Sequence, residues 1–109
     1  LVVVPGAAAV SEAMLARFGR ADAVLFDGTL FTDDEMLRNG ASQKTGRRMG
    51  HMPIDGEGGT LQALAGLECR RIFIHINNTN PMLIDGSPER LKVEAAGWEI
   101  AEDGMEIVL

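Results

Sequence analysis

Three short runs of mainly apolar residues, rich in β-branched side chains, predict buried β-strands. They cover Leu1–Val4, Ala21–Phe26 and Arg71–Ile76. Runs that are apolar at almost every position are typical of strands covered on both faces, as in a parallel sheet. The first run is followed by Pro5-Gly6, a pair that ends a strand.

The segments between these runs have the end signals of helices. A hydroxyl side chain marks the start of three of them, at Ser11, Thr32 and Ser87, because such groups accept hydrogen bonds from the free amides of a first turn. Gly19 and Gly97 are placed to end two of the helices. The predicted helices are Glu12–Phe18 behind Ser11, a helix that begins at Thr32 with Asp33, Asp34 and Glu35, Thr60–Leu67, and a helix from Ser87-Pro88 to Ala96.

The last residues predict a hairpin, because Asp103-Gly104 is a turn signal between two apolar runs. These runs are Trp98–Ala101 and Met105–Leu109. The segment from Asn39 to Gly59 is rich in glycine and predicts a long irregular loop, which in a compact domain is usually functional or disordered. The alternation of strands and helices predicts an α/β fold, with residues 1–109 forming a single partial domain.

Composition narrows the possible functions. The chain has 109 residues, 46% of them hydrophobic, which fits one domain with a core. Its formal net charge of −6 argues against a nucleic-acid partner, since phosphate backbones are bound by clustered Lys and Arg. A single cysteine, Cys69, permits no internal disulfide. With neither a membrane span nor a signal peptide in view, we expect a cytoplasmic protein.

The start of the sequence predicts a fragment. Leu1 opens directly on a strand, with no initiating methionine and no polar segment before it. A strand at this position needs a partner, and an unpartnered edge would be open to aggregation. We therefore expect the chain to be a C-terminal portion of a larger fold.

Asp27, His51 and His75 are the candidate site residues. His51 and His75 are the only histidines, and the three residues follow one another at equal intervals along the sequence. Each lies at the end of a predicted strand or in the glycine-rich loop, and loops at strand ends bring distant side chains together. Imidazole and carboxylate groups are ligands that zinc and iron accept. The pattern predicts a metal site.

Simpler interpretations remain open for each residue. Asp27 before Gly28-Thr29 could only form a turn, and either histidine could be a packing residue. The polar run Asn77–Asn80 could orient His75 or form a capped turn. The string Asp27-Gly28-Thr29 also resembles the first motif of haloacid dehalogenase phosphatases, but Leu25 stands where their nucleophilic aspartate belongs.

Lys44, Arg47 and Arg48 form the one basic cluster. It could bind a carboxylate or phosphate, or it could be a solvated loop. The glycines before Thr60 lack the lysine of a phosphate loop and are interpreted as a helix start.

Three longer strings resemble a known family. They are Phe26–Met36, Lys44–Met52 and Phe73–Pro81, and the likeness continues through Ser87–Arg90 and Ala95–Glu99 to the C-terminus. In these strings the chain resembles the coenzyme PQQ synthesis protein B family of the metallo-β-lactamase superfamily. The resemblance implies the C-terminal part of an αβ/βα sandwich, with the histidine-rich motif of that superfamily lying before this chain.

The resemblance also implies a function. Asp27 and His75 match metal ligands of the superfamily, and His51 matches a catalytic histidine that supports proton transfer in related branches. The family acts in pyrroloquinoline quinone (PQQ) biosynthesis, which implies an Fe(II)-dependent hydroxylase of a Glu-Tyr-derived precursor, with zinc as the alternative metal. Arg47 or Arg48 would bind precursor carboxylates. Other PQQ-biosynthesis proteins are the expected partners.

Two other classes of function remain. The chain could belong to a binding or transport protein that carries PQQ or its precursor towards the periplasm, although it has no run that could span a membrane. It could also be a metal-free structural domain in which both histidines only pack.

Overall fold

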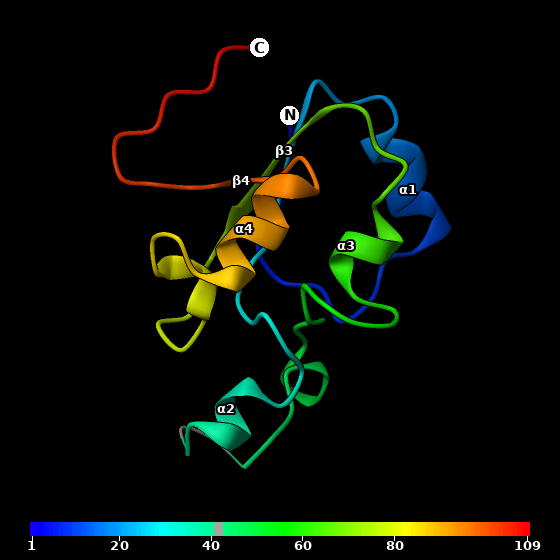
Figure 1. Ribbon diagram of the computed structural model, residues 1–109. Coiled ribbons are helices and arrows are strands. Elements are labelled where there is room, and N and C mark those ends of the chain that lie inside the picture. Colours follow the sequence, from blue (N-terminus) through cyan, green and yellow to red (C-terminus); the bar gives the residue numbers. More distant parts are fainter. Residues whose placement is uncertain (41–42) are drawn as a thin grey trace.

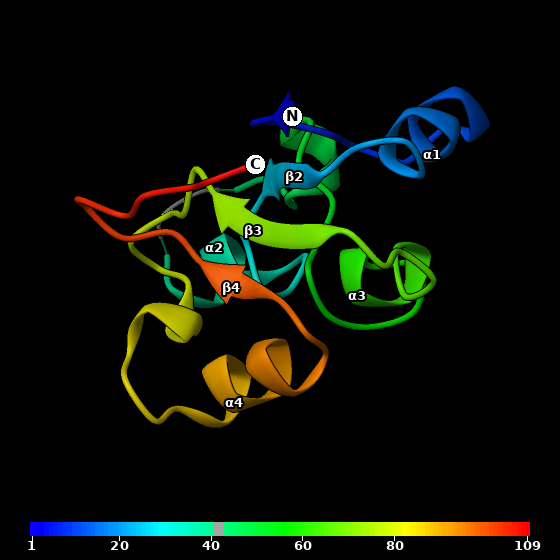
Figure 2. The same ribbon diagram turned by 90° about the horizontal axis from the view of Figure 1, so that it is seen from above.

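A computed structural model describes residues 1–40 and 43–109 and contains a parallel sheet of four strands in the order β1-β2-β3-β4. Figure 2 shows the strands side by side in this order. This arrangement confirms the predicted α/β class. The strands are β1 (Val2–Val4), β2 (Ala23–Asp27), β3 (Arg70–Ile74) and β4 (Glu99–Ile100).

Short helices connect the strands, and α4 lies beside β4 (Figures 1 and 2). As predicted, the Ser11 side chain caps the helix over Glu12–Phe18, and Ser87 caps the one that begins at Pro88. In the described residues the α-helices are α1 (Glu12–Phe18), α2 (Glu35–Arg38), α3 (Thr60–Ala63) and α4 (Pro88–Ala95), and the 3-10 helices are η1 (Arg47–Met49) and η2 (Pro81–Leu83).

Aromatic side chains fill the core on one face of the sheet. Phe26 of β2 and Phe73 of β3 are paired in register and fully buried. The ring of Trp98 stacks on Phe73 with centroids 4.1 Å apart, and Phe18 of α1 meets Phe26 edge-on. Burying side chains of this size contributes on the order of 1.5–3 kcal/mol each. This packing holds β2 and β3 in a fixed register.

The predicted C-terminal hairpin is wrong. A turn does form, since the Met105 amide donates to the Glu102 carbonyl and Gly104 has a φ of 83°. Residues 105–109 contain no strand, and Val108 and Leu109 are exposed. β4 instead pairs in parallel with β3, and Figure 1 shows the tail leaving the sheet. An isolated pair of strands is only marginally stable, so the turn signal alone does not produce a second strand.

Two helix predictions need correction. Thr32 does not cap α2, which begins at Glu35 behind Asp34 with no side-chain cap. The Thr32 hydroxyl accepts a hydrogen bond from Arg38 instead. α3 ends at Ala63 rather than Leu67. Part of the predicted loop between Asn39 and Gly59, residues 41–42, lies outside the described residues.

Gly28 allows β2 and β3 to approach closely just beyond Asp27. A Cβ atom on Gly28 would lie 2.8 Å from the Phe73 Cβ and 3.0 Å from the Ile74 carbonyl oxygen. The Gly28 amide donates to that carbonyl at 2.7 Å. Because only glycine fits here, the sequence Asp-Gly-Thr places its two polar side chains at the carboxyl end of the sheet.

Among the described residues, no helix is long and apolar enough to cross a lipid bilayer.

Candidate metal centre

The structure brings the three predicted ligand residues together at the carboxyl ends of β2 and β3. Asp27 is the last residue of β2, His75 directly follows β3, and His51 follows η1. Each offers a donor atom, and these atoms all lie within 4.8 Å of one another. Asp27 is buried, His51 is partly buried and His75 is exposed. The cluster therefore opens to solvent on the histidine side.

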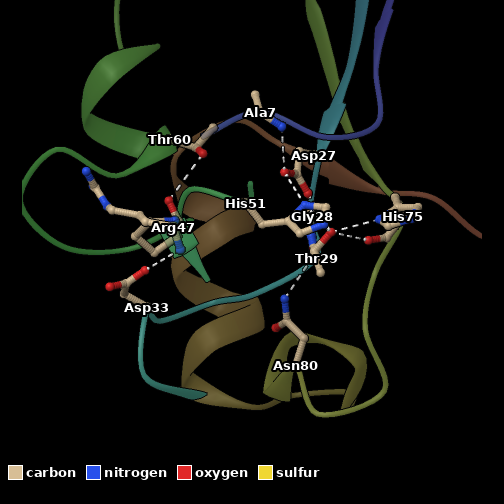
Figure 3. A network of polar contacts seen from close by, with 11 residues as sticks. Ala7, Asp27, Gly28, Thr29, Asp33, Arg47, His51, Thr60, His75 and Asn80 are labelled. Carbon is tan, nitrogen blue, oxygen red and sulfur yellow. Dashed lines mark hydrogen bonds and ion pairs between the residues drawn. The ribbon is translucent and has the colours of Figure 1, made fainter. Parts of the chain in front are cut away.

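The Asp27 carboxylate accepts four hydrogen bonds (Figure 3). Oδ1 accepts from the Thr29 amide at 3.0 Å and from the Thr29 hydroxyl at 2.6 Å. Oδ2 accepts from the Ala7 amide at 3.0 Å and contacts His51 Nδ1 at 2.8 Å. Because a carboxylate has about four lone-pair sites, these contacts use all of them and compensate its burial. Asp27 is thus a turn former and also the anchor of the cluster.

The loop after η1 holds His51 in place through its backbone. The Met52 amide donates to the Ala7 carbonyl at 2.6 Å, and the His51 amide donates to the Gly46 carbonyl at 2.9 Å. A Cβ atom on Gly46 would lie 2.9 Å from the His51 carbonyl oxygen, so this approach requires glycine. Ala7 therefore links the loop to Asp27, because its amide donates to the Asp27 carboxylate and its carbonyl accepts from the Met52 amide.

His75 has an unusual backbone. Its φ is 55°, the only positive value among non-glycine residues of the described chain. The sequence placed His75 inside a strand, whereas β3 ends at Ile74. The left-handed conformation turns the chain and costs on the order of 1 kcal/mol. Its ring stacks on His51 with centroids 5.5 Å apart, so the turn brings the two imidazoles face to face.

The polar run after His75 fastens this loop to the one after β2. The Asn80 side chain is buried, donates to the Gly28 carbonyl at 3.0 Å and accepts from the Met82 amide. The Asn77 amide donates to the Thr29 carbonyl at 3.0 Å. The run is therefore both a capped turn, at the start of η2, and a support for the Asp27 loop.

Glu35 joins the same two loops. Its buried carboxylate accepts hydrogen bonds from the Phe31 amide at 2.9 Å and from the Thr79 hydroxyl at 2.6 Å. The other acids near it, Asp33 and Asp34, lie nearer the surface. Glu35 thus acts structurally.

The basic cluster lies apart from the three ligands. Lys44, Arg47 and Arg48 are exposed, and the Arg47 guanidinium donates to the Gly58 carbonyl at 3.1 Å. Figure 3 shows the Arg47 side chain pointing away from Asp27 and His75. It borders a cavity of about 380 Å³ shared with Asp33 and Asp55. A smaller cavity of about 210 Å³ is lined by Thr29 and His75.

Sequence patterns missed two parts of the cluster. The Thr29 hydroxyl contacts all three predicted ligand residues, and the Ala7 amide binds Asp27. The Asp-Gly-Thr string could have drawn attention to Thr29, because a hydroxyl two residues after a buried aspartate often bonds to it. Ala7 acts through its backbone, so its side chain gives no signal.

Residues 1–76 match the model of a β-lactamase superfamily domain. The chain belongs to the β-lactamase superfamily. Two curated relatives, both called coenzyme PQQ synthesis protein B, come from Methylobacterium radiotolerans and Rhizobium meliloti. They are 54% and 62% identical to it, over 100% and 97% of this chain. The matches cover 37% and 35% of those proteins, so the chain spans about a third of their length.

A solved structure agrees with this family assignment. The crystal structure of Zn²⁺-bound PqqB from Methylobacterium extorquens matches with a TM-score of 0.94 and 53% sequence identity. The match covers 98% of this chain and 39% of that one. The chain therefore has the fold of part of a metallo-β-lactamase-type protein, as the sequence predicted.

Proposed function

We propose that this chain acts, as part of the complete protein, in the biosynthesis of pyrroloquinoline quinone. The identity of 54–62% to proteins named for that role supports the proposal. This role implies two kinds of partner, namely other proteins of the same biosynthesis and a precursor that they supply.

The proposed centre is a metal ion held by Asp27 and His75. The donor atoms of Asp27, His51 and His75, all within 4.8 Å of one another, support it. A carboxylate and an imidazole are suitable ligands for iron or zinc, and His51 lies close enough to serve beside the ion. We favour Fe(II) for the proposed chemistry and keep zinc as the alternative, because the structural relative from Methylobacterium extorquens is described as Zn²⁺-bound. The residues present thus fit the ion.

Ligation by Asp27 would exchange one of its four hydrogen bonds. The contact between Oδ2 and His51 Nδ1 is the one to give up, because the Ala7 amide on the same oxygen is a backbone group fixed by the fold. Losing a buried amide's only acceptor costs roughly 1–3 kcal/mol, whereas the partly exposed His51 ring can turn to water. His51 would then be free to move a proton at Nδ1.

The proposed reaction is hydroxylation of the tyrosine ring in a Glu-Tyr-derived precursor. Dioxygen would supply the inserted oxygen atom, and a two-electron reductant would reduce its other atom to water. When bound, iron would supply the activation of oxygen, which protein side chains cannot perform. Asp27 and His75 would hold the ion at the open edge of the sheet, and His51 would act as the acid or base beside it. Arg47 or Arg48 would pair with precursor carboxylates, since both are exposed cations.

The experiment is an assay of the complete protein, loaded anaerobically with Fe(II) and then given a Glu-Tyr substrate, a two-electron reductant and dioxygen. Mass spectrometry of the product should reveal added oxygen for the wild type and none for Asp27→Asn. Asp85→Asn is the matched control, because the Asp85 side chain is 99% exposed and its ion pair is with Arg90, outside the cluster. If the wild type binds the precursor without hydroxylating it, and Asp27→Asn binds it equally well, the result would contradict an enzymatic function and favour a carrier.

A further inference from the structure

The Thr29 hydroxyl lies at the centre of the candidate metal site. Its Oγ1 atom is 2.6 Å from Asp27 Oδ1, 2.8 Å from His75 Nδ1, 2.9 Å from the His75 carbonyl oxygen and 3.2 Å from His51 Nδ1. Figure 3 shows the hydroxyl between these groups. Thr29 is only 8% exposed, so protein atoms rather than water surround it.

A hydroxyl has one hydrogen to give and two lone pairs to accept with. Two of the four neighbours are oxygen atoms that can only accept, namely Asp27 Oδ1 and the His75 carbonyl. If the hydrogen went to His75 Nδ1 instead, both oxygen contacts would lack a hydrogen at separations below 3 Å, which is repulsive. Donation to Asp27 Oδ1 leaves only the longer contact, to the His75 carbonyl, without one. The hydrogen therefore goes to an oxygen, and Asp27 Oδ1 is the nearer and charged one.

This accounting determines the state of His75. Since the Thr29 hydrogen points to an oxygen, the 2.8 Å contact with His75 Nδ1 must be donated by the imidazole. A neutral imidazole has one N–H group, so its remaining lone pair is on Nε2. The same result follows whichever of the two oxygens receives the hydroxyl hydrogen.

We propose that Thr29 is a positioning residue: its hydroxyl fixes His75 as the Nδ1–H tautomer and leaves Nε2 as the atom that binds the metal. The proposal rests on the metal site proposed above. His75 needs such a partner because it is exposed and itself takes the left-handed conformation, and its stacking on the His51 ring does not select one tautomer. The hydrogen-bonded series Asp27–Thr29–His75 fixes the tautomer of the ring, as a direct bond from the ring to a carboxylate or carbonyl does at other metal-binding histidines.

The tautomer can be measured without a metal. The ¹⁵N chemical shifts of the His75 ring, recorded on the complete metal-free protein with the imidazole neutral, should identify Nδ1 as the protonated nitrogen. A ring protonated at Nε2 in the wild type would overturn the proposal. This measurement needs no variant, so it decides the point even if a substitution prevents folding.

Two substitutions test the hydroxyl itself. Thr29→Val removes it at nearly constant volume and should weaken zinc binding on the order of 10–100-fold and mix the two tautomers of His75. Thr29→Ser keeps the hydroxyl and should restore both properties. Zinc affinity that is equal in Thr29→Val and the wild type would overturn the proposal.

Thr60→Val is the matched control. The Thr60 hydroxyl is also buried, but it donates to the Pro53 carbonyl at 3.3 Å, outside the cluster. This variant should lose stability without losing zinc affinity, and an equal loss of affinity would contradict a specific role for Thr29. If the wild type itself binds no zinc, the proposed function fails, while the effect of Thr29→Val on the His75 tautomer still decides the positioning role.

Discussion

His51 Nδ1 lies 2.8 Å from Asp27 Oδ2, and the two side chains differ sharply in exposure. The Asp27 side chain is fully buried, whereas 21% of the His51 side chain is exposed. A buried carboxylate is costly unless it is hydrogen-bonded, and the amides of Ala7 and Thr29 meet that need from the backbone. His51 is therefore the partner that can leave Asp27 without breaking the fold.

His51→Ala should accordingly spare the metal and impair the reaction. We expect the complete protein to bind the same amount of iron per chain and to hydroxylate its substrate about 10²–10⁴-fold more slowly, the usual effect of losing an acid–base group. Metal analysis and turnover measured on one preparation check this. A loss of bound iron would mean that His51 is itself a ligand.

Gly28→Ala should destabilise the protein by about 1–3 kcal/mol. The new methyl group would lie 2.8 Å from the Phe73 Cβ and 3.0 Å from the Ile74 carbonyl oxygen, so β2 and β3 would have to separate. Urea unfolding gives the free energy. Gly66→Ala is the control, because a Cβ atom there meets nothing within 4 Å, and it should change stability by about 0.5 kcal/mol or less. Equal losses in both variants would disprove the close approach.

Asn80→Ala should weaken both the fold and the metal site. It removes the donor to the Gly28 carbonyl and the acceptor of the Met82 amide, and leaves both groups buried, at a cost of roughly 1–3 kcal/mol. Asn78→Ala changes an exposed neighbour in the same loop and serves as the control. Thermal unfolding and zinc titration of both variants check the expectation. Identical behaviour would mean that the loop after β3 does not depend on Asn80.

The ion pair between Asp55 and Lys92 predicts that part of the stability is lost at low pH. The hydrogen bond of Asp55 with Lys92 of α4 is the main cause that lowers the pKa of the Asp55 carboxyl below its ordinary value. A lowered pKa in the folded state means that the stabilisation is full above the unfolded pKa of about 4 and is lost as the pH falls through the folded value. Asp55→Asn should therefore be less stable than the wild type at pH 7, by no more than about 1 kcal/mol because the pair is partly exposed.

Urea unfolding from pH 7 to pH 3 tests this sign. The difference between Asp55→Asn and the wild type should shrink towards the acid end. Glu99→Gln should behave in the same way, since Arg70 lowers the pKa of Glu99 by a direct hydrogen bond. A difference that stays constant with pH would mean that the charge of Asp55 contributes nothing.

Strands β2 and β3 were predictable from the sequence because they lie inside a parallel sheet with buried residues at their centres. The exposed Val3 shows that β1 is less covered than its apolar run predicted. Phe26 and Phe73 are buried among other apolar residues, so their strands appear as continuous apolar runs. The hairpin prediction failed because a local signal, Asp103-Gly104, says nothing about whether a neighbouring strand is available. Ile100 instead belongs to β4, which follows α4 and pairs in parallel with β3.

The candidate site was predictable in part. Asp27, His51 and His75 could be found because their side-chain types are scarce and lie at strand ends. The turn at His75 could not, because a positive φ at a non-glycine residue depends on contacts made by distant groups such as the Thr29 hydroxyl. The role of the Ala7 amide was equally hidden, since a backbone group looks the same at every residue.

The central claim is that Asp27 and His75 hold a metal ion. The most direct test is an anaerobic titration of the complete protein with iron and with zinc, scored as metal bound per chain, for the wild type, Asp27→Ala, His75→Ala and the exposed control Asp85→Ala. We predict tight binding by the wild type and the control and its loss in the other two variants. Binding that survives both Asp27→Ala and His75→Ala would contradict the metal centre described here.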